Sequence, residues 1–96
     1  MENREEIIEL YDLYSNLLTE KQRNYFEDYY YMDLSISEIS ENYSISRNGV
    51  YDQIKKVVNT LKKIEEALKL KERIDKIENL NIDTDIKNKI IDILKE

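Results

Sequence analysis

The side chains best suited to chemistry in this 96-residue chain lie in one short segment. A serine hydroxyl there precedes the N-terminus of an expected helix, where backbone N–H groups favour a phosphate. Cationic and amide side chains follow, and these could neutralise further phosphates or hydrogen-bond to bases. The candidate residues are Ser46, Arg47, Asn48, Gln53, Lys55 and Lys56. Their types and spacing predict a nucleic-acid interface.

Charge is distributed unevenly along the chain. The whole chain carries a net charge of −6, which argues against a surface coated for nucleic acid. Residues 46–63 contain five cations and one anion, a net charge of +4. The cations are Arg47, Lys55, Lys56, Lys62 and Lys63. Because exposed lysines on a helix need no partner, a polyanion-binding face and an ordinary solvated face both remain open.

The composition favours a protein without catalytic activity. There is no Cys and no His, which removes thiolate nucleophiles, the usual zinc ligands and any Ser-His-Asp arrangement. The single Gly49 cannot form a glycine-rich phosphate loop. Carboxylate pairs are expected by chance among 21 acidic residues. We therefore expect no enzyme, no catalytic or metal site and no cofactor.

The candidate residues belong to a predicted helix-turn-helix. Ser35 stands three residues before Glu38, which is the capping-box spacing that starts a short helix. Ser46 is a favourable N-cap for a second helix that opens with Arg47. Apolar residues at spacings of three and four give this second helix one buried side. They are Val50, Ile54, Val57, Val58 and Leu61.

The helix-turn-helix segment resembles known protein families. The residues Ser35, Glu38, Ile39, Ile45, Ser46, Arg47, Val50 and Ile54 resemble the helix-turn-helix of sigma-factor region 4. With Leu17 to Arg23, Tyr29-Tyr30, Leu34 to Ile39 and Val50-Tyr51-Asp52, the chain more closely resembles the YlxM-like family of small bacterial helix-turn-helix proteins. The resemblance covers roughly the first seventy residues, about the size of a small helical domain. It implies a role in the signal recognition particle pathway.

The chain departs from the sigma-like pattern at two places. Ser44 occupies a turn position that usually carries Gly, so it must adopt a left-handed conformation or a variant turn. Asn48, Gly49 and Asp52 stand where sigma-like proteins present long polar side chains on the outward face. A carboxylate there would repel a phosphate, although it could accept a hydrogen bond from cytosine N4.

Two helices are predicted before the motif, over residues 2–18 and from residue 20 to about residue 32. Thr19 and Gln22 have the capping-box spacing between them. The buried side of the first is expected to include Ile7, Leu10, Tyr11, Tyr14, Leu17 and Leu18, and that of the second Tyr25, Phe26, Tyr29 and Tyr30. Core packing is favoured over base stacking for these aromatic rings. Tyr31, off this stripe, is expected to be exposed.

The second helix of the motif is expected to continue to about Leu68, after which the apolar stripe changes phase. The helix either breaks near Lys69 to Lys71 or changes its packing partner. Asp83 or Thr84 could cap a last amphipathic helix, whose apolar side is Ile86, Ile90, Ile93 and Leu94. This tail could pair with a second copy or pack back onto the tyrosine-rich second helix.

The predicted fold is all-α, a bundle of four to six helices with a long recognition helix. Residues 1–68 would form the helix-turn-helix domain, and residues 69–96 an amphipathic C-terminal extension. The acidic start and the lack of a long apolar stretch indicate a cytoplasmic protein without a membrane span. We expect a regulatory nucleic-acid-binding protein with DNA or RNA, signal recognition particle components and a second copy as candidate partners. The alternative is an adaptor that binds protein and not DNA.

Overall fold

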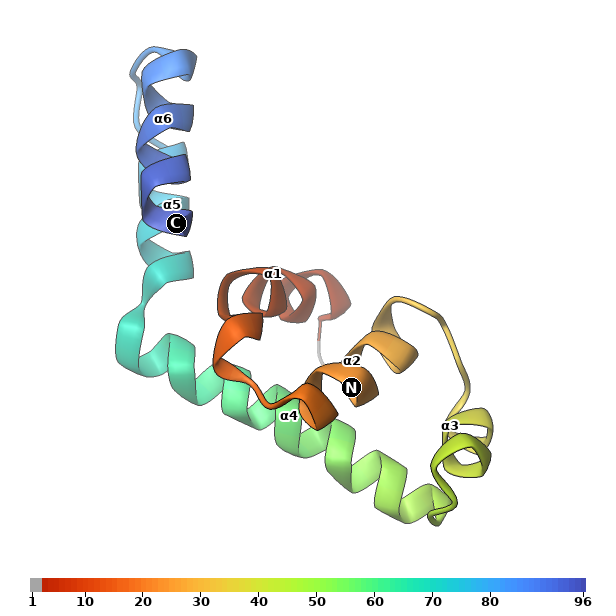
Figure 1. Cartoon of the computed structure of the whole chain (residues 1–96). Coiled ribbons are helices and arrows are strands. Elements are labelled where there is room, and N and C mark those ends of the chain that lie inside the picture. The colour runs from red at the N-terminus through yellow and green to blue at the C-terminus, as the bar shows by residue number, and fades with distance from the viewer. Residues whose placement is uncertain (1–2) are drawn as a thin grey trace.

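The computed structural model describes residues 3–96, and every regular element in that range is helical. The elements are α1 (Arg4–Tyr14), the 3₁₀ turn η1 (Ser15–Leu17), α2 (Glu20–Tyr30), α3 (Ile36–Tyr43), α4 (Arg47–Leu68), α5 (Leu70–Glu78) and α6 (Thr84–Lys95). Helices α1, α2 and α3 gather around α4, whereas α5 and α6 form a hairpin beyond its C-terminal end (Figure 1). The predicted all-α helix-turn-helix bundle with a long second helix is confirmed.

Side-chain caps start the helices where the sequence places them. Thr19 Oγ1 accepts the Gln22 N–H at 3.1 Å, and the Gln22 side chain accepts the Thr19 N–H at 2.9 Å. Ser35 and Glu38 form the same reciprocal pair, with both distances at 3.1 Å. Both predicted capping boxes are therefore present, and each satisfies two donors that a helix N-terminus would otherwise leave unpaired.

The core lies between α4 and the three helices that precede it. All five residues of the predicted α4 stripe are buried. Aromatic rings of α1 and α2 fill the other side, where Tyr11 stacks on Phe26 with centroids 4.0 Å apart and Phe26 on Tyr30 at 4.4 Å. Tyr25 is also buried, while Tyr29 is half-buried and Tyr31 is exposed. The aromatic cluster is a packed core, as predicted.

The first two helices end earlier than predicted. Helix α1 stops at Tyr14, and the chain continues as a 3₁₀ turn, in which three residues complete a turn. This tighter winding changes the phase of the stripe, so Leu18 is buried but Leu17 is 62% exposed. The prediction that Leu17 faces the core was wrong. Helix α2 ends at Tyr30 rather than near Met32.

The break after α4 falls at Lys69, which decides between the two alternatives that the stripe left open. Lys69 adopts a left-handed conformation with φ 56° and ψ 30°. The Glu65 carboxylate accepts the N–H groups of Lys71 at 3.0 Å and Glu72 at 3.1 Å, so it caps the start of α5. The Tyr14 hydroxyl donates to Glu65 at 2.5 Å. This contact ties the bend to α1.

Helix α6 packs on α5 and not on α2 (Figure 1). The predicted alternative of packing onto the tyrosine-rich second helix was therefore wrong. Ile91 is the buried residue of α6, whereas Ile86, Ile90 and Ile93 are 54%, 37% and 64% exposed. The apolar side of α6 is wide, and the position of α5 decides which part of it is covered. The sequence of α6 alone does not reveal that position. None of the described helices is long and apolar enough to cross a membrane.

Candidate nucleic-acid interface

The turn between α3 and α4 fixes the start of the recognition helix. Ser44 takes the left-handed conformation, with φ 55° and ψ 44°, which is one of the two conformations predicted for it. The Ile45 N–H donates to the Ser40 carbonyl at 3.1 Å, closing the end of α3. Ser46 Oγ then accepts the Gly49 N–H at 3.0 Å as the N-cap of α4.

Gly49 has a packing role that the sequence did not reveal. A Cβ atom at this position would lie 3.2 Å from Ser46 Oγ and 3.6 Å from Ile45 Cδ1. A side chain at this position would therefore contact the turn that precedes α4. The missing Cβ leaves space for the turn to close over the first turn of α4.

Five of the six predicted interface residues are exposed on the first three turns of α4: Ser46, Arg47, Asn48, Lys55 and Lys56. The sixth, Gln53, is half-buried. Because successive helical residues are rotated by about 100°, Gln53 lies roughly 160° around the axis from Lys55. Lys56, by contrast, lies about 180° from Arg47 and only about 60° from Gln53. The structure therefore exposes five of the residues around the start of α4, and Gln53 differs from them in being half-buried.

The cations of this surface are available for a ligand. Arg47, Lys55 and Lys56 form no ion pair or hydrogen bond through their side chains with any residue that the structure describes. Directly behind them, Val50, Ile54 and Val57 are at most 1% exposed. A buried apolar face of α4 therefore supports an exposed cationic one. The exposed carboxylate of Asp52 lies between them and weakens the local positive field.

The candidate set omitted Tyr51, which is 43% exposed on the same part of α4. A signal for it was present in the sequence, because Tyr51 follows Arg47 by four residues and precedes Lys55 by four. Residues at this spacing are neighbours on a helix surface. The exposed segment of α4 thus carries an aromatic ring between two cations.

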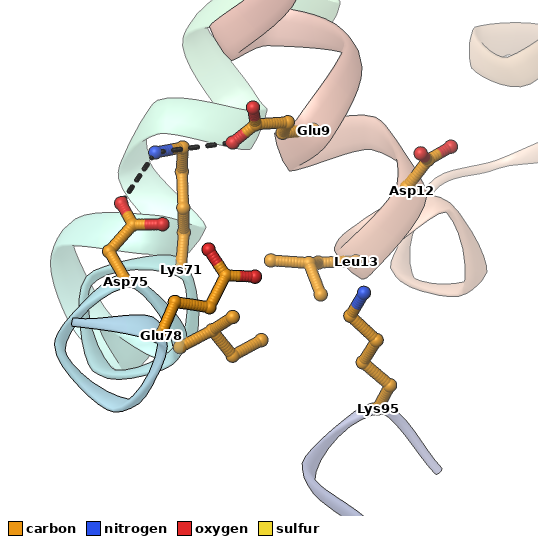
Figure 2. A pocket seen from close by; sticks show the side chains of 8 residues that line it. Glu9, Asp12, Leu13, Lys71, Asp75, Glu78 and Lys95 are labelled. Atoms are coloured by element: carbon orange, nitrogen blue, oxygen red, sulfur yellow. Dashed lines mark hydrogen bonds and ion pairs between the residues drawn. The ribbon is translucent and has the colours of Figure 1, made fainter. Parts of the chain in front are cut away.

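A cavity of about 160 Å³ lies at the other end of the molecule, between α1, α5 and α6. Figure 2 shows Glu78 and Lys95 directed toward it from either side of Leu13. Lys71 bridges α1 and α5 through Glu9 at 3.3 Å and Asp75 at 2.8 Å. The Asp75 hydrogen bond raises the pKa of Lys71 above its usual value.

This cavity is unsuited to a polyanion. The charged groups that line it are the carboxylates of Glu9, Asp12, Asp75 and Glu78 and the amines of Lys71 and Lys95. Carboxylates predominate, and a phosphate placed there would be repelled. No group of three or more His, Cys, Asp or Glu residues in the described part of the chain could hold a metal ion. The basic part of α4 is the better candidate interface.

Comparison with known proteins identifies relatives along the whole chain. The family model UPF0122, described as "Putative helix-turn-helix protein, YlxM / p13 like", matches residues 1–96. A UPF0122 protein of Clostridium perfringens is 44% identical over 100% of this chain and 96% of its own length. A UPF0122 protein of Thermoanaerobacter sp. is 51% identical over 73% of this chain and 60% of its own. One of Mycoplasma capricolum is 42% identical over 86% and 80%.

Proposed function

Because the chain belongs to the YlxM/p13-like family of helix-turn-helix proteins, we propose that it is a non-enzymatic regulatory protein that binds nucleic acid in the cytoplasm. The proposed interface is the exposed start of α4, with Ser46, Arg47, Asn48, Lys55 and Lys56. Ser46 and the first N–H groups of the helix would hold one phosphate. The cations would neutralise others, and Asn48 could contact a base.

One observation carries this proposal. Arg47, Lys55 and Lys56 have no acidic partner among the described residues, although the chain as a whole has an excess of acids. Three cations outside α4 do pair with carboxylates: Arg4 with Asp33, Lys71 with Glu9 and Asp75, and Lys76 with Glu72. Cations kept unpaired on a rigid exposed helix are suited to a phosphate ligand.

The proposal is tested by removing two cations of the interface. The double variant Arg47→Ala with Lys56→Ala should bind a random DNA duplex at least tenfold more weakly than the natural sequence, measured by fluorescence anisotropy at low salt. A control with Lys21→Ala and Lys89→Ala removes the same charge from exposed positions outside α4. Equal losses for the two variants would show that net charge alone is responsible.

The ligand in the cell is a separate question. The resemblance to YlxM-like proteins implies signal recognition particle components, so the RNA of that particle is proposed as a candidate ligand beside DNA. Anisotropy with this RNA and with duplex DNA of equal length compares the two directly. Tighter binding of the particle RNA at equal salt would favour the pathway. Equal or weaker binding would argue against it.

An adaptor function is the second candidate, and the exposed apolar residues of α6 favour it. Ile86, Ile90 and Ile93 recur at spacings of four and three, so they form one stripe on the projecting hairpin. Exposed apolar stripes commonly mark protein interfaces. We propose that this extension, residues 69–96, contacts protein while the domain of residues 1–68 contacts nucleic acid. A second copy of the chain is the first partner to test.

The absence of cysteine makes that test simple. The variant Ile90→Cys has one thiol on the stripe and should form a disulfide-linked dimer under mild oxidation. Leu17→Cys, on the exposed 3₁₀ turn, is the control. Equal cross-linking of the two variants, with a monomer mass in sedimentation, would contradict self-association through α6.

A further inference from the structure

Tyr51 differs from every other tyrosine in the described structure. The hydroxyl groups of Tyr11, Tyr14, Tyr31 and Tyr43 donate to carboxylates, and the rings of Tyr25, Tyr29 and Tyr30 contact other aromatic rings. Tyr51 has neither a hydrogen bond nor a ring contact with a described residue. Its ring contributes little to the core and is available to a ligand.

The ring is flanked by cations on both sides. Arg47, Tyr51 and Lys55 are separated by four residues each, so they form a continuous ridge with about 6 Å between successive positions along the axis. Both cations are exposed and without an ion pair to the described residues. Asp52 lies about 100° around the helix from Tyr51, but it is three residues from Lys55 and therefore borders the ridge beside that lysine.

The shape of α4 selects the kind of nucleic acid that this ridge could enter. A helix with its side chains is about 10–12 Å wide, and the major groove of B-form DNA is about 12 Å wide. The major groove of A-form RNA is too deep and narrow for a helix. Arg47 and Lys55 are about 12 Å apart along the axis, so the two cations could reach phosphates on the two strands that border the groove.

We propose that Tyr51 is a sequence-reading residue of α4 and that it contacts thymine in the major groove of duplex DNA. This inference rests on the proposed function. The major-groove edge of thymine presents a C5-methyl group and the O4 acceptor. The phenol ring offers an apolar edge to the methyl group, and its hydroxyl can donate to O4. Arg47 and Lys55 would bind phosphates on either side of the groove and so position the Tyr51 ring against the base.

The experiment begins with selection of a preferred duplex from a random library by the full-length protein. Anisotropy then gives the affinities of the natural sequence and of Tyr51→Ala for the selected duplex and for a random one. Tyr51→Ala should weaken binding to the selected duplex about tenfold while the log–log salt slope stays unchanged. Its preference for the selected duplex should largely disappear. Tyr31→Ala, which removes a tyrosine of similar exposure directly after α2, is the matched control.

Uracil in place of thymine provides the second measurement, because it removes only the C5-methyl group. The natural sequence should bind the uracil duplex more weakly, and Tyr51→Ala should bind both duplexes equally. An unchanged preference for the selected duplex in Tyr51→Ala would overturn the inference. If Arg47→Ala with Lys56→Ala weakens binding while Tyr51→Ala retains the preference, only this inference fails. If the natural sequence binds no duplex, the proposed interaction with DNA fails as well.

Discussion

The two ends of α4 differ in how they are held and in what they present. At the N-terminal end, a fully buried apolar face supports exposed cations. At the C-terminal end, a bend at Lys69 leads into a hairpin that is tied to α1 by polar contacts and by the packing of Leu70, and that presents apolar side chains and carboxylates. One long helix thus separates a charged surface on the core from an apolar surface on an arm. Substitutions at one end should leave the other intact.

The largest expected difference concerns stability. Leu61 of α4 is fully buried, so Leu61→Ala should lower the free energy of unfolding by about 2–5 kcal/mol. Ile90→Ala on the arm should cost under about 1 kcal/mol, because its side chain is 37% exposed. Urea denaturation followed by circular dichroism measures both. Similar losses would show that the arm is as tightly integrated as the core.

The hydroxyl group of Tyr14 tests the junction between the two regions. It donates to Glu65 and accepts the Leu70 N–H at 3.2 Å, so Tyr14→Phe removes two contacts at the bend. We expect a loss of about 1–2 kcal/mol in unfolding free energy. Hydrogen exchange should accelerate in α5 and α6 more than in α4. Tyr31→Phe, which removes a more exposed hydroxyl bonded to Asp12, is the control and should have a smaller effect.

Alkaline pH should weaken the same junction. Burial and the hydrogen bond to Glu65 raise the pKa of Tyr14 from 10.0 to about 12. A group whose pKa is raised by folding stabilises the fold fully below its unfolded pKa and loses that contribution as pH rises through the folded value. The raised pKa of Lys71 acts in the same direction. The urea midpoint should therefore fall between pH 10 and pH 12, and less steeply in Tyr14→Phe.

A smaller effect compares the two left-handed residues that bound α4. Ser44 and Lys69 both have a positive φ, of 55° and 56°, which glycine adopts without steric cost. Ser44→Gly and Lys69→Gly should each change the unfolding free energy by at most about 1 kcal/mol, in the stabilising direction if relief of strain exceeds the added freedom of the unfolded chain. Ser44→Ala keeps the strain and serves as the control. Destabilisation by both glycines would contradict strain at these positions.

Much of the fold was predictable because its signals are local. The Thr19 and Ser35 capping boxes and the α4 stripe depend on residues within one or two helical turns. The phase change of the stripe after Leu68 located the bend at Lys69 but did not decide between a break and a new packing partner, because the bend also depends on Tyr14 of a distant helix. Which apolar side chains of α6 are exposed likewise depends on a non-local feature, the position of α5.

The candidate site was predicted less completely than the fold. The sequence located the cations of α4, and the structure places Arg47, Lys55 and Lys56 on the exposed surface. Gln53 is half-buried and lies about 160° around the axis from Lys55, which the helical rotation already indicated. The spacing of Tyr51 from Arg47 and Lys55 was visible in the sequence. That its ring and hydroxyl lack a partner, unlike those of the other tyrosines, depends on the fold and could not be predicted.

The measurement that tests the central claim most directly is the salt dependence of nucleic-acid binding by the natural sequence. Fluorescence anisotropy against random duplex DNA and signal recognition particle RNA at several salt concentrations gives the log–log slope. A slope of about −3 or steeper on either ligand is predicted, since each neutralised phosphate of duplex DNA contributes about −0.9 and each in a single strand about −0.7. No binding to either at low salt, or binding that salt does not weaken, would contradict the account and favour a protein ligand on the hairpin.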